Sequence, residues 1–154
     1  PAAAPVFLPC LSGIRTPWNR PDMTGRVTGL HPGVTPAMLA YATMEGVAFQ
    51  FADCVAAQQE VGARPERFTV VGGGTRSRLW LRLLSTALDR PVSLIDGADI
   101  AGPRGAARLA AVAAGAPASV LGEPIAPTGL VSPEMALAEA IAPRREAMRA
   151  MMMS

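Results

Sequence analysis

The sequence predicts an α/β fold, built on a parallel strand–helix–strand unit with further helices on its flanks. Two β-branched runs, residues 68–71 and 91–95, are separated by an amphipathic segment that is long enough for a helix. An Ala-rich helical segment follows the second run, and this alternation is typical of a parallel sheet. Half of the 154 residues are hydrophobic, which is enough for the core of one domain.

Residues 1–35 are predicted to form an ordered loop region. They carry many Pro and Gly residues without a sustained hydrophobic period, so only one short strand is expected, near residues 26–30. A long irregular stretch of this kind is uncommon inside a compact domain and is often functional. The stretch starts at Pro1 and lacks the basic start of a signal peptide, so we expect the chain to begin inside a longer protein or at an engineered boundary.

A long amphipathic helix is predicted over residues 37–61. Thr35 suits the N-cap, Pro36 suits the first helical position, and Gly62 suits the end. Gly46 in the middle of the helix is expected to mark close packing against another element. Apolar residues recur every three to four positions, as on one helix face. The predicted inward face consists of Met44, Val47, Phe51 and Val55.

Three consecutive glycines, Gly72, Gly73 and Gly74, separate the first strand from a helix expected over residues 77–88. Glycine is costly to order, so the run indicates either a tight structural turn or a ligand that approaches the backbone. Exposed N–H groups and the helix dipole favour a phosphate or nucleotide at such a turn. The segment GGGTRS nevertheless matches neither G-x-G-x-x-G nor the P-loop, so the motif alone leaves both readings open. The inward face of this helix is predicted to hold Leu79, Leu83, Leu84 and Ala87.

The remaining elements are a helix over residues 99–114, a loop over 117–133 and a last helix from about 132 to 148. Two strands alone would leave both outer edges of the sheet unpaired. We therefore expect the rest of the sheet to come from residues outside this chain or from another chain. As domains, this gives one partial domain over residues 1–154: a loop region (1–35), a core (36–116), and a C-terminal tail and helix (117–154).

The composition disfavours several classes of function. All fourteen basic residues are Arg, the net charge is +2, and the arginines are scattered apart from Arg76, Arg78 and Arg82, which disfavours nucleic-acid binding. No uninterrupted apolar run is long enough to span a membrane. Cys10, Cys54 and the single His31 are too few and too dispersed for a disulfide or metal framework. We expect two free thiols, no metal ligands in this chain, and a cytoplasmic protein.

Four blocks of the sequence resemble the FGGY carbohydrate kinases in their order and spacing: FLPCLSGIRTPWNRPDMTGRVTGL, ATMEGVAF, FTVVGGGTRSRLW and DIAGPRGAARLAAVAAG. Within that family the chain is most similar to the xylulokinases, through LSGIRTPW and the C-terminal APRREAMRAM. The resemblance covers nearly the whole chain. The chain departs from the family pattern at Ile14, Arg82, Thr86 and Arg104, where Glu, Gln, Asp and an apolar residue are usual.

The resemblance implies the later part of the second of two ribonuclease-H-like (actin/hexokinase-type) lobes. It places Gly72, Gly73, Gly74 and Ser77 on the adenosine motif, where a Cβ would collide with the nucleotide. It places Gly105, Ala106 and Ala107 on a second motif, where small residues let two helices slide as the lobes close. A branched side chain at Gly73 is further expected to strain a turn that needs a positive φ.

The implied whole enzyme transfers a phosphoryl group from ATP, with Mg²⁺, to D-xylulose. Its partners are a pentulose and the preceding lobe, and a homodimer is left open. The alternatives are an FGGY kinase for glycerol, ribulose, gluconate or fuculose, or a nucleotide-binding module without catalysis. No catalytic residue is expected here, since the resemblance places the catalytic Asp and the phosphate loops upstream. Glu45 either lines the cleft or is structural. Surface, helix or loop positions are expected for Asp22, Asp53, Asp89, Asp96 and Asp99.

Overall fold

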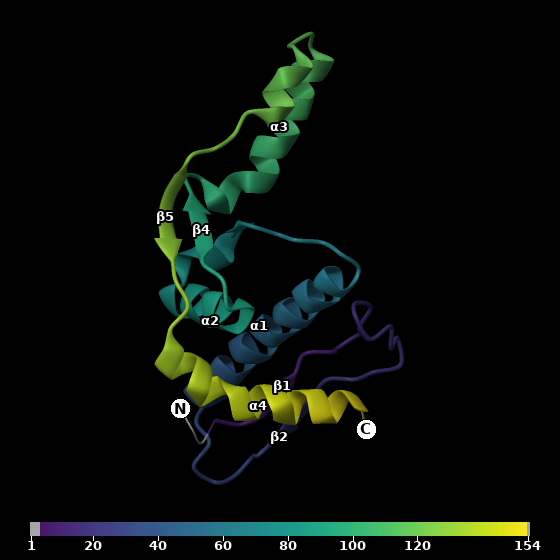
Figure 1. Cartoon of the computed structure of the whole chain (residues 1–154), viewed down its shortest axis with the longest axis vertical. Coiled ribbons are helices and arrows are strands. Elements are labelled where there is room, and N and C mark those ends of the chain that lie inside the picture. The colour runs from purple at the N-terminus through teal and green to yellow at the C-terminus, as the bar shows by residue number, and fades with distance from the viewer. Residues whose placement is uncertain (1–3, 154) are drawn as a thin grey trace.

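The computed structural model describes residues 4–153, and its first sheet is a small antiparallel pair (Figure 1). Strand β1 (Val6–Leu8) pairs with β2 (Arg26–Thr28), with Val6 opposite Thr28. The expected strand near residues 26–30 is therefore confirmed, whereas β1 was missed. Strand β1 is short and lies among prolines, so it has no detectable alternation and depends on its contact with the helix that follows.

Helix α1 (Pro36–Glu60) begins as predicted, because the Thr35 hydroxyl accepts a hydrogen bond from the Met38 N–H (3.3 Å). The close packing expected at Gly46 is also confirmed, since a Cβ there would collide with the Phe7 carbonyl oxygen of β1. The predicted inward face was right only in part, since Met44 packs against the core but Phe51 is 51% exposed. The buried residues are Phe49, four small residues and two acids; the acids have Arg partners, and the small residues let neighbouring elements approach. The buried set is Ala42, Glu45, Gly46, Ala48, Phe49, Ala52 and Asp53.

The second sheet contains the predicted parallel pair. Strand β3 (Phe68–Thr69) runs parallel to β4 (Val92–Ile95), and helix α2 (Arg78–Leu88) connects them. Strand β5 (Pro127–Val131) adds to β4 in the antiparallel direction, so the prediction of a loop over residues 117–133 was wrong. One of the two edges expected to be open is thus covered from within the chain. The outer edge of β3 has no strand partner in the described part of the chain.

Helix α2 packs between this sheet and α1, and its burial begins only at Leu81. Leu79, which was predicted to face inward, lies before that point and is 38% exposed. Leu81 and Leu84 contact Val92 of the sheet, while Leu83 enters the larger core. Because α2 is buried on two sides, a prediction with one inward face identified only some of its buried residues.

Helix α3 (Ala101–Ala113) projects away from the rest of the fold and buries none of its residues (Figure 1). Helix α4 (Met135–Met153) crosses the opposite end, against α1 and β1, and extends beyond the predicted end near residue 148. Short 3₁₀ helices complete the order: η1 (Gly73–Arg76), η2 (Ala98–Ile100) and η3 (Ala118–Gly122). Among residues 4–153, no helix is long and apolar enough to cross a membrane.

Candidate functional site

The glycine turn connects β3 to α2 and is held by the loop after β4. Val70 still bonds the sheet, through its N–H to the Ser93 carbonyl (3.1 Å). The Gly72 N–H then donates to the Ala98 carbonyl (2.7 Å), which ties the turn to η2. The chain next makes the single 3₁₀ turn of η1 before α2 begins at Arg78. The turn therefore has a defined shape at the carboxyl end of a parallel strand, where ligands of α/β folds commonly bind.

The three glycines of the turn differ in conformation and surroundings. Gly72 has φ +93°, a conformation that side chains disfavour. Gly74 lies under Trp80, and a Cβ there would come within 3.0 Å of the indole Nε1. Gly73 is exposed, its φ is not positive, and a Cβ there would meet nothing within 4 Å. The expectation of a positive φ at Gly73 was thus wrong, since Gly72 makes the reversal.

Two N–H groups of the turn precede its first internal hydrogen bond. That bond runs from the Thr75 N–H to the Gly72 carbonyl (3.1 Å), so the N–H groups of Gly73 and Gly74 lie before it, as at any helix start. The Thr75 hydroxyl also donates to the Gly72 carbonyl (2.8 Å). An exposed backbone whose first N–H groups lie outside the hydrogen bonds of the turn, with an open face at Gly73, fits a ligand that lies against the turn.

Ser77, the fourth residue of the predicted adenosine motif, has a structural role. Its hydroxyl accepts a hydrogen bond from the Trp80 N–H (3.2 Å) and so caps α2. The hydroxyl proton is still available to a ligand, because the cap uses only an oxygen lone pair. Ser77 therefore connects the turn to α2 as the N-cap of that helix.

An apolar cavity of about 570 Å³ lies beside the turn and is lined by residues of α1, α2, β3 and β4. Its walls include Val71, Gly74, Trp80 and Phe51, and the last two rings meet edge to face with centroids 6.3 Å apart. Phe51 was predicted to face the core, but it lines this cavity instead. The cavity and the exposed face of Gly73 thus lie around one turn.

The arginine cluster seen in the sequence is divided in space. Arg76 pairs with Asp99 (2.5 Å) and links η1 to η2, whereas Arg82 makes a bidentate pair with Glu134. The hydrogen bond from Arg76 lowers the pKa of Asp99 below its ordinary value. The stabilisation from this ion pair is therefore fully present at pH values above the ordinary pKa of an Asp side chain. It is lost as the pH falls through the lowered pKa of Asp99. The departures from the family pattern at Arg82 and Thr86 have a shared partner, since the Thr86 hydroxyl accepts from the Glu134 N–H (3.2 Å).

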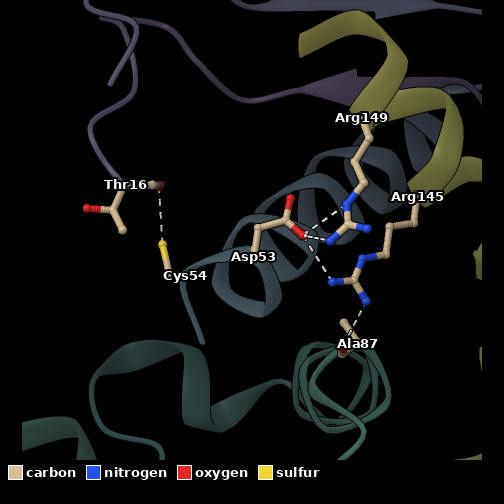
Figure 2. Close-up of polar contacts among 6 residues, drawn as sticks. All are labelled: Thr16, Asp53, Cys54, Ala87, Arg145 and Arg149. Atoms are coloured by element: carbon tan, nitrogen blue, oxygen red, sulfur yellow. Dashed lines mark hydrogen bonds and ion pairs between the residues drawn. The ribbon is translucent and has the colours of Figure 1, made fainter. Parts of the chain in front are cut away.

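The acidic residues follow the sequence prediction with one correction. Asp53 is in a helix as expected but is buried, with 3% of the residue exposed, and its Oδ1 accepts hydrogen bonds from Arg145 and Arg149 of α4 (Figure 2). The sequence offered no signal for this, because 92 residues separate Asp53 from Arg145. Glu45 is structural, since it pairs with the buried Arg144 through two contacts of 2.7 Å. Within residues 4–153, no three His, Cys, Asp or Glu side chains gather as a metal site.

The predicted hinge residues lie on the projecting helix α3. Gly105, Ala106 and Ala107 are all exposed, and a Cβ at Gly105 would meet nothing within 4 Å. Cys10 and Cys54 are free thiols, as expected, and burial raises the pKa of each. His31 lies in a turn, where its Nδ1 accepts from the Gly33 N–H (3.1 Å).

Comparison with known proteins identifies the family. Residues 1–114 match the C-terminal domain of the FGGY family of carbohydrate kinases. The chain belongs to this family. The chain is 40% identical over 114 residues to a xylulose kinase of Escherichia coli, and 42% identical over 113 residues to one of Klebsiella pneumoniae. It covers 24% and 23% of those proteins, so it spans about a quarter of the length of these FGGY relatives.

Solved FGGY kinase structures match nearly the whole chain. A structure described as a xyloylose kinase from Brucella ovis aligns with a TM-score of 0.82 at 36% identity, over 97% of this chain and 31% of that one. A glycerol kinase from Plasmodium falciparum, solved with ADP, aligns over 97% of this chain and 30% of that one with a TM-score of 0.71; at 18% identity it shows the fold alone. The matches confirm the actin-like ATPase fold expected from the resemblance.

Proposed function

We propose that this chain is the C-terminal part of an ATP-dependent kinase that phosphorylates the 5-hydroxyl of D-xylulose. Two relatives at 40% and 42% identity are named xylulose kinases, which supports this sugar. A glycerol kinase of Citrifermentans bemidjiense is 38% identical over 87 residues, so another sugar of the FGGY group is the alternative. A nucleotide-binding module without catalysis is the remaining alternative. The cytoplasmic location expected from the sequence stays a prediction.

The observation that carries the nucleotide assignment is the open face of Gly73. Conformation explains Gly72 and packing explains Gly74, but nothing within the described chain explains the absence of a side chain at Gly73. A bound adenosine would explain it, because a side chain there would project into the space the ligand needs. The free N–H groups of Gly73 and Gly74 would donate to it, and Ser77 would hold the turn against α2.

The phosphoryl chemistry itself needs groups that we do not assign to this chain. ATP supplies the transferred phosphoryl group, and such transfer depends on positioning, on Mg²⁺ and on a carboxylate that takes the hydroxyl proton. We assign neither a Mg²⁺ ligand nor a base among the described residues. Gly105, Ala106 and Ala107 are proposed to face the preceding lobe, since they are small, exposed and on a helix that buries none of its residues.

The test of the reaction is a coupled assay of the full-length protein with ATP, Mg²⁺ and a panel of sugars: D-xylulose, glycerol, ribulose, gluconate and fuculose. We expect the highest kcat/KM with D-xylulose. A higher value with another sugar would replace the substrate, and nucleotide binding without turnover of any sugar would favour the non-catalytic module. The 154-residue chain alone should show no turnover, because lost positioning by itself forfeits ~7–11 kcal/mol of barrier reduction.

The test of the nucleotide turn is Gly73→Val in the full-length protein. The KM for ATP should rise about tenfold, which corresponds to about 1.4 kcal/mol, while the KM for the sugar stays near wild type. Gly122→Val is the matched control. Gly122 lies in η3, outside the glycine turn, and a Cβ there also meets nothing within 4 Å. Equal weakening of both substrates in a folded Gly73→Val protein would place the adenosine elsewhere.

A further inference from the structure

Arg145 of α4 joins three helices through one guanidinium group. Its Nη2 donates to Oδ1 of Asp53 on α1 (3.0 Å), and its Nη1 donates to the Ala87 carbonyl on α2 (3.3 Å). Figure 2 shows the guanidinium between the two helices, with Arg149 on the same carboxylate oxygen and a dashed line to Ala87 from Arg145 alone. Arg145 thus connects α4 to the C-terminal end of α2, the helix that begins after the glycine turn.

The Ala87 carbonyl belongs to the C-terminal end of α2, where carbonyls lack helical partners. The N–H groups of Asp89 and Arg90 donate to the carbonyls of Thr86 and Ser85 (both 3.2 Å). Arg145 donates to the carbonyl of Ala87, the next residue of the helix. Its positive charge also suits the negative end of the helix dipole. Helix α2 is therefore held at both ends, by Ser77 at the glycine turn and by Arg145 at the other end.

Further contacts from the segment before α4 hold the same half of α2. Glu134 pairs with Arg82 and donates its N–H to the Thr86 hydroxyl (3.2 Å), and the Ser85 hydroxyl donates to the Ser132 carbonyl (3.2 Å). We call Ser132, Glu134 and Arg145 the C-terminal clamp. All three lie beyond residue 114, outside the part that matches the FGGY C-terminal domain. The matched part holds the turn, whereas the clamp belongs to the segment after it.

The Asp53 cluster is poorly arranged for stability alone. The side chain of Asp53 is 2% exposed, yet its Oδ2 and the Nε of Arg145 are buried without a hydrogen-bond partner in the described part of the chain. Buried charges cost desolvation energy, and an incompletely paired cluster recovers little of it. The effect that follows directly from its contacts is geometric, because they fix the positions of α4, α1 and α2 relative to one another.

We infer that Arg145 is a positioning residue for the nucleotide, acting through α2 on the glycine turn. The inference rests on the proposed function. Helix α2 has 11 residues and is about 16 Å long. Because a helix of this length moves as a rigid unit, a displacement at Ala87 also displaces its N-cap Ser77 and the glycine turn that precedes it. Loss of Arg145 should therefore disturb the nucleotide more than the sugar, although Arg145 contacts neither the turn nor the residues proposed to bind the nucleotide.

The test compares Arg145→Met with Arg149→Met in the full-length protein. Each variant removes one guanidinium from Asp53 and leaves the other. Arg149 makes two contacts with Oδ1 of Asp53 and Arg145 makes one, so Arg149→Met removes at least as much of the Asp53 pairing, whereas only Arg145→Met also removes the link to Ala87. We expect Arg145→Met to raise the KM for ATP roughly fivefold, below the ~100-fold that a 1 Å misplacement can cost. The sugar KM and kcat should stay within about twofold of wild type, and Arg149→Met should match wild type. Arg145→Lys should fall between, since the charge remains but a single nitrogen cannot reach both Asp53 and the Ala87 carbonyl as the guanidinium fork does.

A second readout does not depend on activity. Backbone hydrogen exchange over residues 72–77 should be faster in Arg145→Met than in Arg149→Met, at equal thermal stability. Equal KM values for ATP together with equal exchange would overturn the inference. If Arg145→Met does not fold, faster exchange in Arg145→Lys than in wild type supports it and unchanged exchange overturns it. If the wild-type protein phosphorylates no sugar, the proposed function fails, and the exchange comparison decides the positioning role alone.

Discussion

Replacing Glu45 by Gln should cost this chain a large part of its stability. Glu45 and Arg144 are 2% and 7% exposed, and two contacts of 2.7 Å join them. The guanidinium carbon also lies over the ring of Tyr41, 5.8 Å from the ring centroid. Gln keeps the shape of the side chain but leaves Arg144 buried without its counter-charge. Breaking a buried pair in this way costs about 3–5 kcal/mol. For a domain of this size each kcal/mol lowers Tm by roughly 2–4 °C, so a fall of about 6–20 °C is expected.

The assay is urea unfolding of the chain at neutral pH, followed by far-ultraviolet circular dichroism. Asp22→Asn is the control, because it removes the carboxylate from the exposed pair with Arg20 and should leave the midpoint unchanged. A double variant, Glu45→Leu with Arg144→Met, should recover most of the loss, since no charge then stays buried unpaired. A loss below about 1 kcal/mol for Glu45→Gln would refute the reasoning, because it is the value typical of a solvated pair.

Three further predictions concern the same core. Gly46→Ala should lower the free energy of unfolding by about 1–3 kcal/mol, since its Cβ must displace the Phe7 carbonyl; an unchanged urea midpoint would contradict this contact. Iodoacetamide should modify Cys54 before Cys10 in the native chain, because Cys10 is fully buried, and mass spectrometry of the digest decides the order. Burial, and then the charge of Glu45, raise the pKa of Tyr41, the one tyrosine of the sequence. Stability should therefore be retained below the ordinary tyrosine pKa of about 10 and fall as the pH rises through the raised pKa, and Tyr41→Phe should remove that fall.

Local signals in the sequence were sufficient for several elements of the fold. The cap at Thr35, the parallel unit of β3, α2 and β4, and the turn of three glycines all depend on neighbouring residues in the chain. Capping, strand propensity and turn formation are short-range effects, so they can be read from a few adjacent letters. The family likewise followed from motifs whose order and spacing are properties of the sequence.

Only the tertiary structure decided which glycine turns the chain, which pairs are buried and where the sheet ends. Gly72 instead of Gly73 has the positive φ and donates its N–H to Ala98 of η2, and β5 is a strand because it pairs with the free edge of β4. Asp53 is buried because two arginines, 92 and 96 residues away, meet it on α1. Long-range pairing of this kind leaves no periodic trace in the sequence, because the partners are brought together by the packing of whole helices. For the same reason the sequence could indicate the glycine turn but not the C-terminal clamp that holds its helix.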